Sequence, residues 1–166
     1  STPTLRQSGE KETLFISSNG IVEAYNFLTG KSLWEKGGMT GNTVASPSLG
    51  KDLLVVGSSA PDQTMALSLE GVEDGSAKVV WLAEDASSSF GSPLVTGSFL
   101  YLVNRAGVVT CHDLKDGSKK WNLRLPASCW ASPMKTEGRI YFFTKDGVTV
   151  VLKDDGSKEI LAENKL

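Results

Sequence analysis

The sequence predicts an all-β fold made from four copies of one four-stranded unit. Two markers recur along the 166 residues: a small hydroxyl residue followed by proline, and a strand–turn–strand stretch that ends in tryptophan. Both return about 40 to 47 residues apart, a period typical of repeated supersecondary units. No stretch of about ten residues places its apolar side chains at helical spacing. The fold class therefore rests on the repeat and on the strand-like composition of each copy.

The first unit shows how each copy divides into strands. Runs rich in β-branched and aromatic residues cover Thr2–Leu5, Thr13–Ser17, Ile21–Asn26 and Lys31–Lys36. The turn between the second and third runs is Asn19-Gly20, a pair favoured in two-residue hairpins because both positions need positive φ. Ala106-Gly107 and Asp146-Gly147 take its place in the third and fourth units, where the last predicted run is Lys158–Ala162. Each unit is therefore expected to be a four-stranded antiparallel sheet.

The hydroxyl–proline marker sets the unit boundaries. It occurs at Thr2-Pro3, Ser46-Pro47, Ser92-Pro93 and Ser132-Pro133. Proline donates no ladder hydrogen bond, so it is expected at the first residue of a strand. Four-stranded sheets that recur at this period are typical of a β-propeller. We therefore expect one domain over residues 1–166, with blades at about 1–43, 44–89, 90–129 and 130–166.

The stretch that ends in tryptophan predicts how neighbouring blades pack. A large flat side chain on the outermost strand can fill the gap between two blades while its indole N–H donates to a backbone acceptor. The small Ala24 leaves room beside such a ring, and the fourth unit has Leu161 at the position expected for tryptophan. The second unit carries an insertion, Gly71–Ser76, which is expected to project from the ring. The predicted structural docking residues are Ala24, Thr29, Gly30, Trp34, Trp81, Gly117 and Trp121.

These residues resemble a known family. Ala24-x-Asn26-x-x-Thr29-Gly30-Lys31-x-x-Trp34 is similar to the tryptophan-docking motif of the pyrroloquinoline-quinone (PQQ) repeat propellers, and the Ser-Pro starts and DG-x-x-x-W ends are similar too. The resemblance covers essentially the whole chain and is strongest in the first and third units. It points to the non-catalytic branch, which includes the periplasmic lipoprotein of the outer-membrane barrel-assembly machinery. The resemblance implies a non-enzymatic scaffold or binding module without a cofactor, in a periplasmic or secreted location.

The number of units does not determine how the ring is completed. Members of this family usually have seven or eight blades, so four units make about half a ring. Three outcomes are considered: half of a larger protein, two chains that complete an eight-bladed ring as a homodimer, or a closed four-bladed ring. We favour a fragment of an eight-bladed protein, with the ring completed by a second copy or by a protein partner.

The alternative function is that of a quinoprotein dehydrogenase whose PQQ and calcium ligands lie largely in other blades. Family members that oxidise alcohols have adjacent cysteines, whereas Cys111 and Cys129 are separated here. Most acidic residues fall in predicted turns, where aspartate is favoured for local hydrogen bonding. His112 is the only histidine and has no ligand partners at metal-site spacing. We therefore predict no catalytic, cofactor-binding or metal-binding residues, and either two buried thiols or one disulfide.

The composition narrows the class of partner. With 17 basic and 19 acidic residues the chain has a net charge of −2, which offers no basic field for nucleic acid. No apolar run approaches the roughly 20 residues that cross a bilayer. The inter-unit segments and hairpin tips are expected to share one face of the ring, where binding loops usually lie. Phe90 and Trp130 fall there as candidate partner-binding residues. A core role is the competing interpretation, because Val44 occupies the equivalent position.

Overall fold

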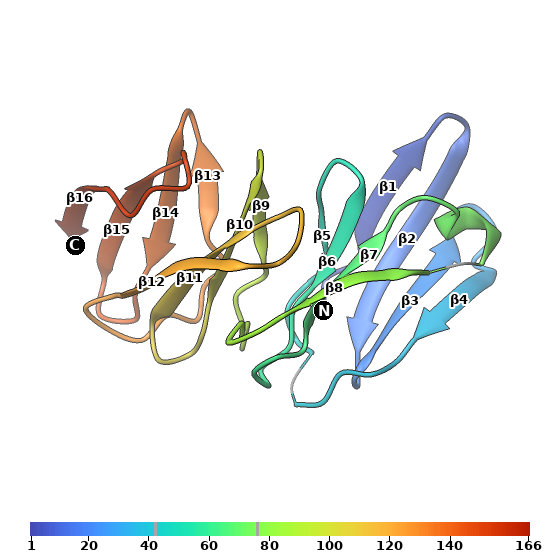
Figure 1. Cartoon of the computed structure of the whole chain (residues 1–166), viewed down its shortest axis with the longest axis horizontal. Coiled ribbons are helices and arrows are strands. Elements are labelled where there is room, and N and C mark those ends of the chain that lie inside the picture. Colours follow the sequence, from blue (N-terminus) through green and yellow to red (C-terminus); the bar gives the residue numbers. More distant parts are fainter. Residues whose placement is uncertain (42, 76) are drawn as a thin grey trace.

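Four separate four-stranded antiparallel sheets make up the computed structural model of the chain, in which residues 1–41, 43–75 and 77–166 are described (Figure 1). Blade 1 contains β1 (Thr4–Ser8), β2 (Lys11–Ser18), β3 (Ile21–Asn26) and β4 (Ser32–Lys36). Blade 2 contains β5 (Ser48–Leu49), β6 (Leu53–Val56), β7 (Thr64–Ser68) and β8 (Val79–Ala83). Blade 3 contains β9 (Leu94–Thr96), β10 (Phe99–Val103), β11 (Val108–Asp113) and β12 (Lys119–Arg124). Blade 4 contains β13 (Met134–Thr136), β14 (Arg139–Phe143), β15 (Val148–Lys153) and β16 (Ile160–Lys165).

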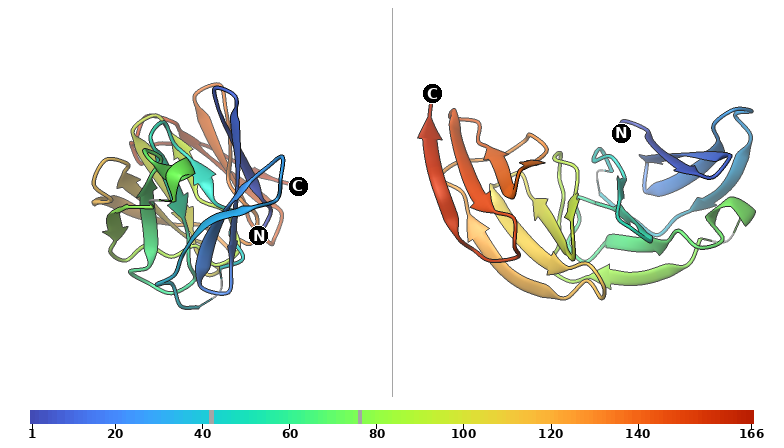
Figure 2. Two further views of the ribbon diagram at one scale, coloured as in Figure 1. Left: turned by 90° about the vertical axis from the view of Figure 1, so that its right-hand side faces the viewer. Right: turned by 90° about the horizontal axis from the view of Figure 1, so that it is seen from above.

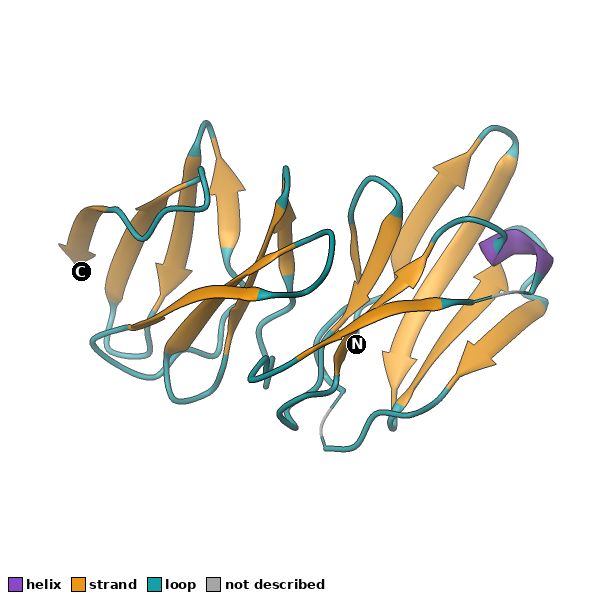
Figure 3. Ribbon diagram, in the orientation of Figure 1, coloured by secondary structure: helices purple, strands orange, loops and turns teal. Residues whose placement is uncertain are grey.

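The all-β fold class and the four-fold repeat are confirmed. Consecutive strands are hydrogen-bonded neighbours within every sheet. The one helical element among the described residues is a short 3-10 helix, η1 (Val72–Asp74), in blade 2 (Figure 3). The outer strands differ from prediction in their bounds: β1 extends through Ser8 and β16 through Lys165. Backbone pairing decides these ends, because polar residues such as Gln7 pair with Glu12 without any β-propensity signal of their own.

The four blades form an open arc, with blade 1 and blade 4 at its opposite ends (Figure 2). The hairpin tips between the second and third strands, and the links from one blade to the next, lie on the lower side of Figure 1. We call this side the loop face. The arrangement is an arc rather than a closed four-bladed ring, so the end blades each present one sheet face that no other blade in the chain covers.

The hydroxyl–proline markers join the blades to one another. The backbone N–H of Thr2 donates to Ser46 Oγ at 3.0 Å, that of Ser46 to Ser92 Oγ at 3.0 Å, and that of Ser92 to Ser132 Oγ at 2.9 Å. In each unit the proline comes directly before the first strand, as its missing N–H requires. The repeated serine is therefore a link between blades, with its hydroxyl accepting from the preceding unit.

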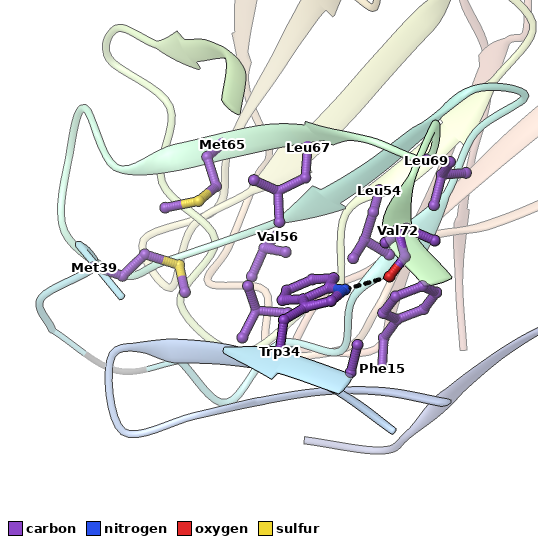
Figure 4. Packing of buried hydrophobic residues seen from close by; sticks show 11 residues of the cluster. Phe15, Trp34, Met39, Leu54, Val56, Met65, Leu67, Leu69 and Val72 are labelled. Carbon is purple, nitrogen blue, oxygen red and sulfur yellow. Dashed lines mark hydrogen bonds between the residues drawn. The ribbon is translucent and has the colours of Figure 1, made fainter. Parts of the chain in front are cut away.

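Apolar side chains fill the three spaces between neighbouring blades. Figure 4 shows the space between blades 1 and 2, which contains Phe15, Trp34, Leu54, Leu67 and Val72. The space between blades 2 and 3 contains Val55, Trp81, Leu100, Leu102 and Leu114, and that between blades 3 and 4 contains Tyr101, Cys111, Ile140, Phe142 and Leu152. Burial of each large apolar side chain stabilises the fold by about 1.5–3 kcal/mol. The contacts between sheets, rather than any sheet alone, therefore hold the arc together.

Each blade has a register shift between its third and fourth strands, and in blades 1 to 3 this shift lies beside the tryptophan. Ala24 pairs with Trp34, Ala66 with Trp81 and Cys111 with Trp121, directly beside the shift in each sheet. In blade 4 the residue pair at the same place is Val151 and Ala162. The prediction that Leu161 takes the tryptophan position is therefore wrong. Leu161 is the extra residue of the bulge, because Leu152 already pairs with Ile160.

The insertion of blade 2 is part of a blade interface. Val72 is fully buried, and its carbonyl accepts a hydrogen bond from Trp34 Nε1 at 2.6 Å (Figure 4). The prediction that Gly71–Ser76 merely projects from the ring is therefore wrong for Val72, whereas Ser76 lies outside the described residues. An insertion that supplies the acceptor for the neighbouring indole explains how blade 2 keeps the interface despite its longer connection.

Candidate partner-binding surface

The candidate surface is centred on Trp130 in the link between β12 and β13. Its ring stacks on Phe90, with the centroids 5.1 Å apart and the planes inclined by 30°. The Arg105 guanidinium lies 5.2 Å from the centroid of the Trp130 ring, and Lys145 Nζ lies 5.4 Å from it. Trp130 is 47% exposed. We call Phe90, Arg105, Trp130 and Lys145 the aromatic–cation cluster.

Backbone contacts on both sides of Trp130 fix its link. Cys129 forms a β-bridge with Thr144, and its thiol donates to the carbonyl of Phe143 at 3.2 Å. Gly91 passes so close to this link that a Cβ on it would lie 2.8 Å from the Ala131 carbonyl oxygen. The indole is therefore presented from an ordered segment of backbone.

The two cations reach the indole from the tips of different hairpins. Arg105 lies in the β10–β11 tip, where its N–H donates to Ser89 Oγ at 3.2 Å. Lys145 lies in the β14–β15 tip, where its N–H donates to the Ser128 carbonyl at 2.8 Å. Both side chains are exposed, and within the described ranges neither has an ion-pair partner. Asp146, also exposed, is the acidic neighbour along the chain.

Sequence reasoning identified the two aromatic members of the cluster and missed the two cations as members. Arg105 and Lys145 belong to different units, so no spacing in the sequence connects either one to Trp130. One feature of the sequence could have identified the two cations: both occupy predicted hairpin tips, which lie on the loop face. The core interpretation is wrong for Val44 and Trp130, which are 49% and 47% exposed, whereas Phe90 is half-buried beneath the indole.

The three tryptophans predicted to dock lie at the blade interfaces. Trp34 donates to Val72, Trp81 Nε1 donates to the Leu114 carbonyl at 2.9 Å, and Trp121 Nε1 donates to the Gly156 carbonyl at 2.9 Å. Each acceptor belongs to the following blade. The buried Ala24 lies opposite Trp34 in the sheet.

The predicted glycines of the docking turns have different surroundings. Gly117 has φ +76°, and a Cβ on it would lie 2.8 Å from Trp81 Cδ2, so the indole packs directly on its backbone. Gly30 has φ +68° and no atom within 4 Å of its Cβ position. Thr29 shapes that exposed turn, because its N–H and hydroxyl both donate to Asn26 Oδ1 at 2.9 Å. The turn of blade 1 thus has the conformation of a docking turn with no indole against it.

The histidine and the cysteines are buried. His112 Nδ1 donates to the Gly117 carbonyl at 3.0 Å, and burial lowers the pKa of this imidazole. Cys111 and Cys129 are free thiols within the core between blades 3 and 4. Burial raises the pKa of Cys111 to about 11 and also raises that of Cys129. Both thiols are therefore protonated at neutral pH and shielded from solvent.

Residues 1–41, 43–75 and 77–166 contain no group of three or more His, Cys, Asp and Glu side chains placed to hold a metal ion. In the same ranges no helix has both the length and the apolar character needed to span a membrane.

A profile of the family described as outer membrane protein assembly factor BamB matches residues 18–159. The chain belongs to this BamB family. Comparison with curated protein sequences found no match. Within the BamB family a solved structure is available for comparison: BamB from Moraxella catarrhalis superposes with a TM-score of 0.74 at 16% identity, over 98% of this chain and 47% of that one.

Two further solved structures share the fold of this BamB-family chain. Sqt1 from Saccharomyces cerevisiae matches with a TM-score of 0.82 at 11% identity, over 99% of this chain and 48% of that one. The computationally designed Ika4 protein matches with a TM-score of 0.71 at 15% identity, over 92% of this chain and 91% of that one. At these identities the likeness shows the β-propeller fold alone. The chain spans about half the length of the BamB and Sqt1 structures that it matches.

Proposed function

We propose that this chain is a non-enzymatic propeller module that binds a protein partner through its loop face, in the periplasm or another compartment outside the cytoplasm. One observation carries the proposal: Trp130 is 47% exposed although it is stacked on Phe90 and held in an ordered link. Trp34 and Trp81, by contrast, are only 8% and 7% exposed. Tryptophan and arginine are enriched at the energetic centres of protein interfaces, so an exposed indole beside Arg105 favours partner binding.

Membership of the family supports the same proposal. The family is that of an outer membrane protein assembly factor, which favours a scaffold role and a periplasmic location for this chain. A role without catalysis is favoured by the burial of the histidine and both thiols, which are the side chains best suited to nucleophilic or proton-transfer chemistry at neutral pH.

We further propose that four more blades complete the ring, supplied by the rest of a longer protein, by a second copy of the chain in a homodimer or by a protein partner. At each end of the arc, two half-buried side chains support completion of the ring by further blades. They are Leu14 and Tyr25 in blade 1, and Tyr141 and Phe143 in blade 4. Leu14 pairs with Tyr25 on the sheet face of blade 1 that points away from the core, so apolar surface is available there. The length of the chain, about half that of the BamB structure, agrees with this proposal.

Photo-crosslinking tests the binding role. A photoreactive phenylalanine analogue replaces Trp130 on the loop face or Lys115 in the β11–β12 turn, at the opposite end of β11 from the Arg105 tip. In the cell envelope of the native host we expect one discrete protein adduct from position 130 and none from position 115. Equal adducts from both positions, or none from position 130, would contradict the proposed loop-face function.

The quinoprotein alternative has a separate test. Trp121 and Trp130 are partly exposed, so a quinone bound near either one would quench fluorescence. We expect no saturable quenching when PQQ and calcium are titrated into the protein. Saturable quenching at micromolar PQQ would overturn the non-enzymatic proposal.

A further inference from the structure

We infer that the aromatic–cation cluster recognises an acidic peptide segment, with its carboxylates placed between Arg105 and Lys145 and its chain lying against Trp130. This inference rests on the proposed function, because it names the chemistry of the partner bound by the loop face. It is carried by the geometry of four side chains from four separate segments of the fold.

The first step concerns the two charges. Arg105 and Lys145 both approach the same ring, at 5.2 and 5.4 Å from its centroid. Two cations near one ring repel each other, and no ion pair within the described ranges neutralises either of them. Other exposed lysines do have carboxylate partners: Lys119 lies 2.6 Å from Asp85, and Lys153 lies 2.9 Å from Asp155. The cluster is therefore a local positive site on a chain whose net charge is −2.

The second step concerns the shape of the ligand. Carboxylates form charge-assisted hydrogen bonds with guanidinium and ammonium groups, and arginine can hold a carboxylate with two parallel bonds. Residues two apart on an extended chain lie on the same side and about 6.6 Å from each other. A segment with acidic residues at positions i and i+2 would therefore present both carboxylates to the same side of the cluster, while the exposed indole provides apolar contact for the stems of its side chains.

The third step separates a peptide from other anionic polymers. Nucleic acid is bound through many phosphate contacts spread along a basic surface, commonly about 6 to 10 of them. The cluster offers two cations, and Asp146 beside Lys145 adds a negative charge at its border. A short acidic segment of protein matches this small charge and this aromatic platform better than a nucleic-acid backbone does.

The experiment uses the indole N–H signals of the 15N-labelled protein, because each tryptophan gives its own resonance. Trp34, Trp81 and Trp121 donate to backbone carbonyls between blades, so their signals report on the fold. The Trp130 signal is assigned with Trp130→Phe, which keeps an aromatic ring on Phe90. The probes are short oligoglutamate, oligoglutamine and oligothymidylate, each titrated at low and at physiological salt.

We expect oligoglutamate to shift the Trp130 signal saturably and to leave the other three unchanged. The double variant Arg105→Gln, Lys145→Gln should weaken this binding about tenfold, the size expected for the loss of charge-assisted hydrogen bonds. The matched control Lys115→Gln removes an exposed lysine from the β11–β12 turn and should leave the binding unchanged. Higher salt should weaken the binding of the wild-type protein.

Several results would overturn the inference. Equal binding of oligoglutamine would show that charge is not recognised, and an equal loss in Lys115→Gln would show that the attraction is not local to the cluster. Tighter binding of oligothymidylate would assign the surface to nucleic acid instead. If position 130 crosslinks to a protein whose capture is unaffected by the double variant or by salt, the acidic-segment inference fails while the proposed binding function stands.

Discussion

Ala162 lies opposite Val151 in blade 4, the register position at which the other three blades carry tryptophan. The outer face of blade 4 therefore lacks the indole that each preceding blade extends to its neighbour. At the other end of the arc, the Gly30 turn of blade 1 has no atom within 4 Å of the glycine's Cβ position. A ring closed by two copies would bring together a turn that can receive an indole and a face that does not supply one.

We predict that Ala162→Trp strengthens self-association of the chain. The new indole would reach the turn of blade 1 in a second copy, and a buried aromatic side chain with a satisfied N–H contributes enough to tighten the dimer by about tenfold or more. Light scattering on a sizing column over a range of concentrations measures the change relative to the wild-type protein.

Leu161→Trp is the matched control for this substitution. It places the same side chain one residue away, at the extra residue of the bulge rather than opposite Val151. If both variants associate equally, the effect is one of added surface hydrophobicity. If neither associates more than the wild type, two copies do not complete the ring in the proposed way.

The close contact between Gly117 and Trp81 predicts a specific loss of stability. A Cβ at Gly117 would lie 2.8 Å from two atoms of the indole, and the residue has positive φ. Gly117→Ala should therefore cost about 1–2 kcal/mol for the left-handed backbone and about 1–3 kcal/mol more for overpacking. Gly30→Ala, at a similar φ with open space around it, should cost only the first amount. Urea unfolding of both variants measures the difference, and equal costs would show that the indole does not press on Gly117.

Stability should depend on the protonation of His112. Burial lowers its pKa in the folded state, the hydrogen bond to Gly117 only partly offsets this, and Lys119 lowers it further while Asp85 raises it. The unfolded chain binds a proton near pH 6.5, before the folded chain does. The stabilisation is therefore complete above about pH 6.5 and falls as the pH drops through that value, by at most about 1.4 kcal/mol per pH unit.

His112→Asn tests this prediction, since asparagine can still donate to the Gly117 carbonyl but does not titrate. The free energy of unfolding of the wild-type protein should decline relative to that of the variant between about pH 7 and pH 5. Parallel profiles over this range would mean that the imidazole is not desolvated in the folded protein.

Both cysteines should be unreactive in the folded protein. Their burial and the raised pKa of each thiol keep the reactive thiolate scarce. A thiol-specific chromogenic reagent should modify neither residue under native conditions and both after denaturation. Modification of neither residue after unfolding, with both thiols released by reductant, would indicate a disulfide instead of two free thiols.

The sequence by itself determined the repeat, and through it the fold. The spacing of the Ser-Pro and tryptophan markers predicts four four-stranded sheets, because each unit must bury its apolar faces against an identical neighbour. The same periodicity gave the three tryptophans that lie at the blade interfaces. The strand ends were less predictable, since polar residues such as Gln7 join a sheet through backbone hydrogen bonds alone.

Only the tertiary structure decided what surrounds each residue. Applying the ten-residue spacing of Ala24 and Trp34 to Val151 places Leu161 at the tryptophan position. The pairing of β15 with β16 places Ala162 there instead, because the connection between these strands is one residue longer. Arg105 and Lys145 meet Trp130 because hairpin tips of neighbouring blades converge beside the link between them. The sequence shows which residues recur. Contacts between residues of different units depend on how the blades are placed in space. The candidate binding surface consists of such contacts.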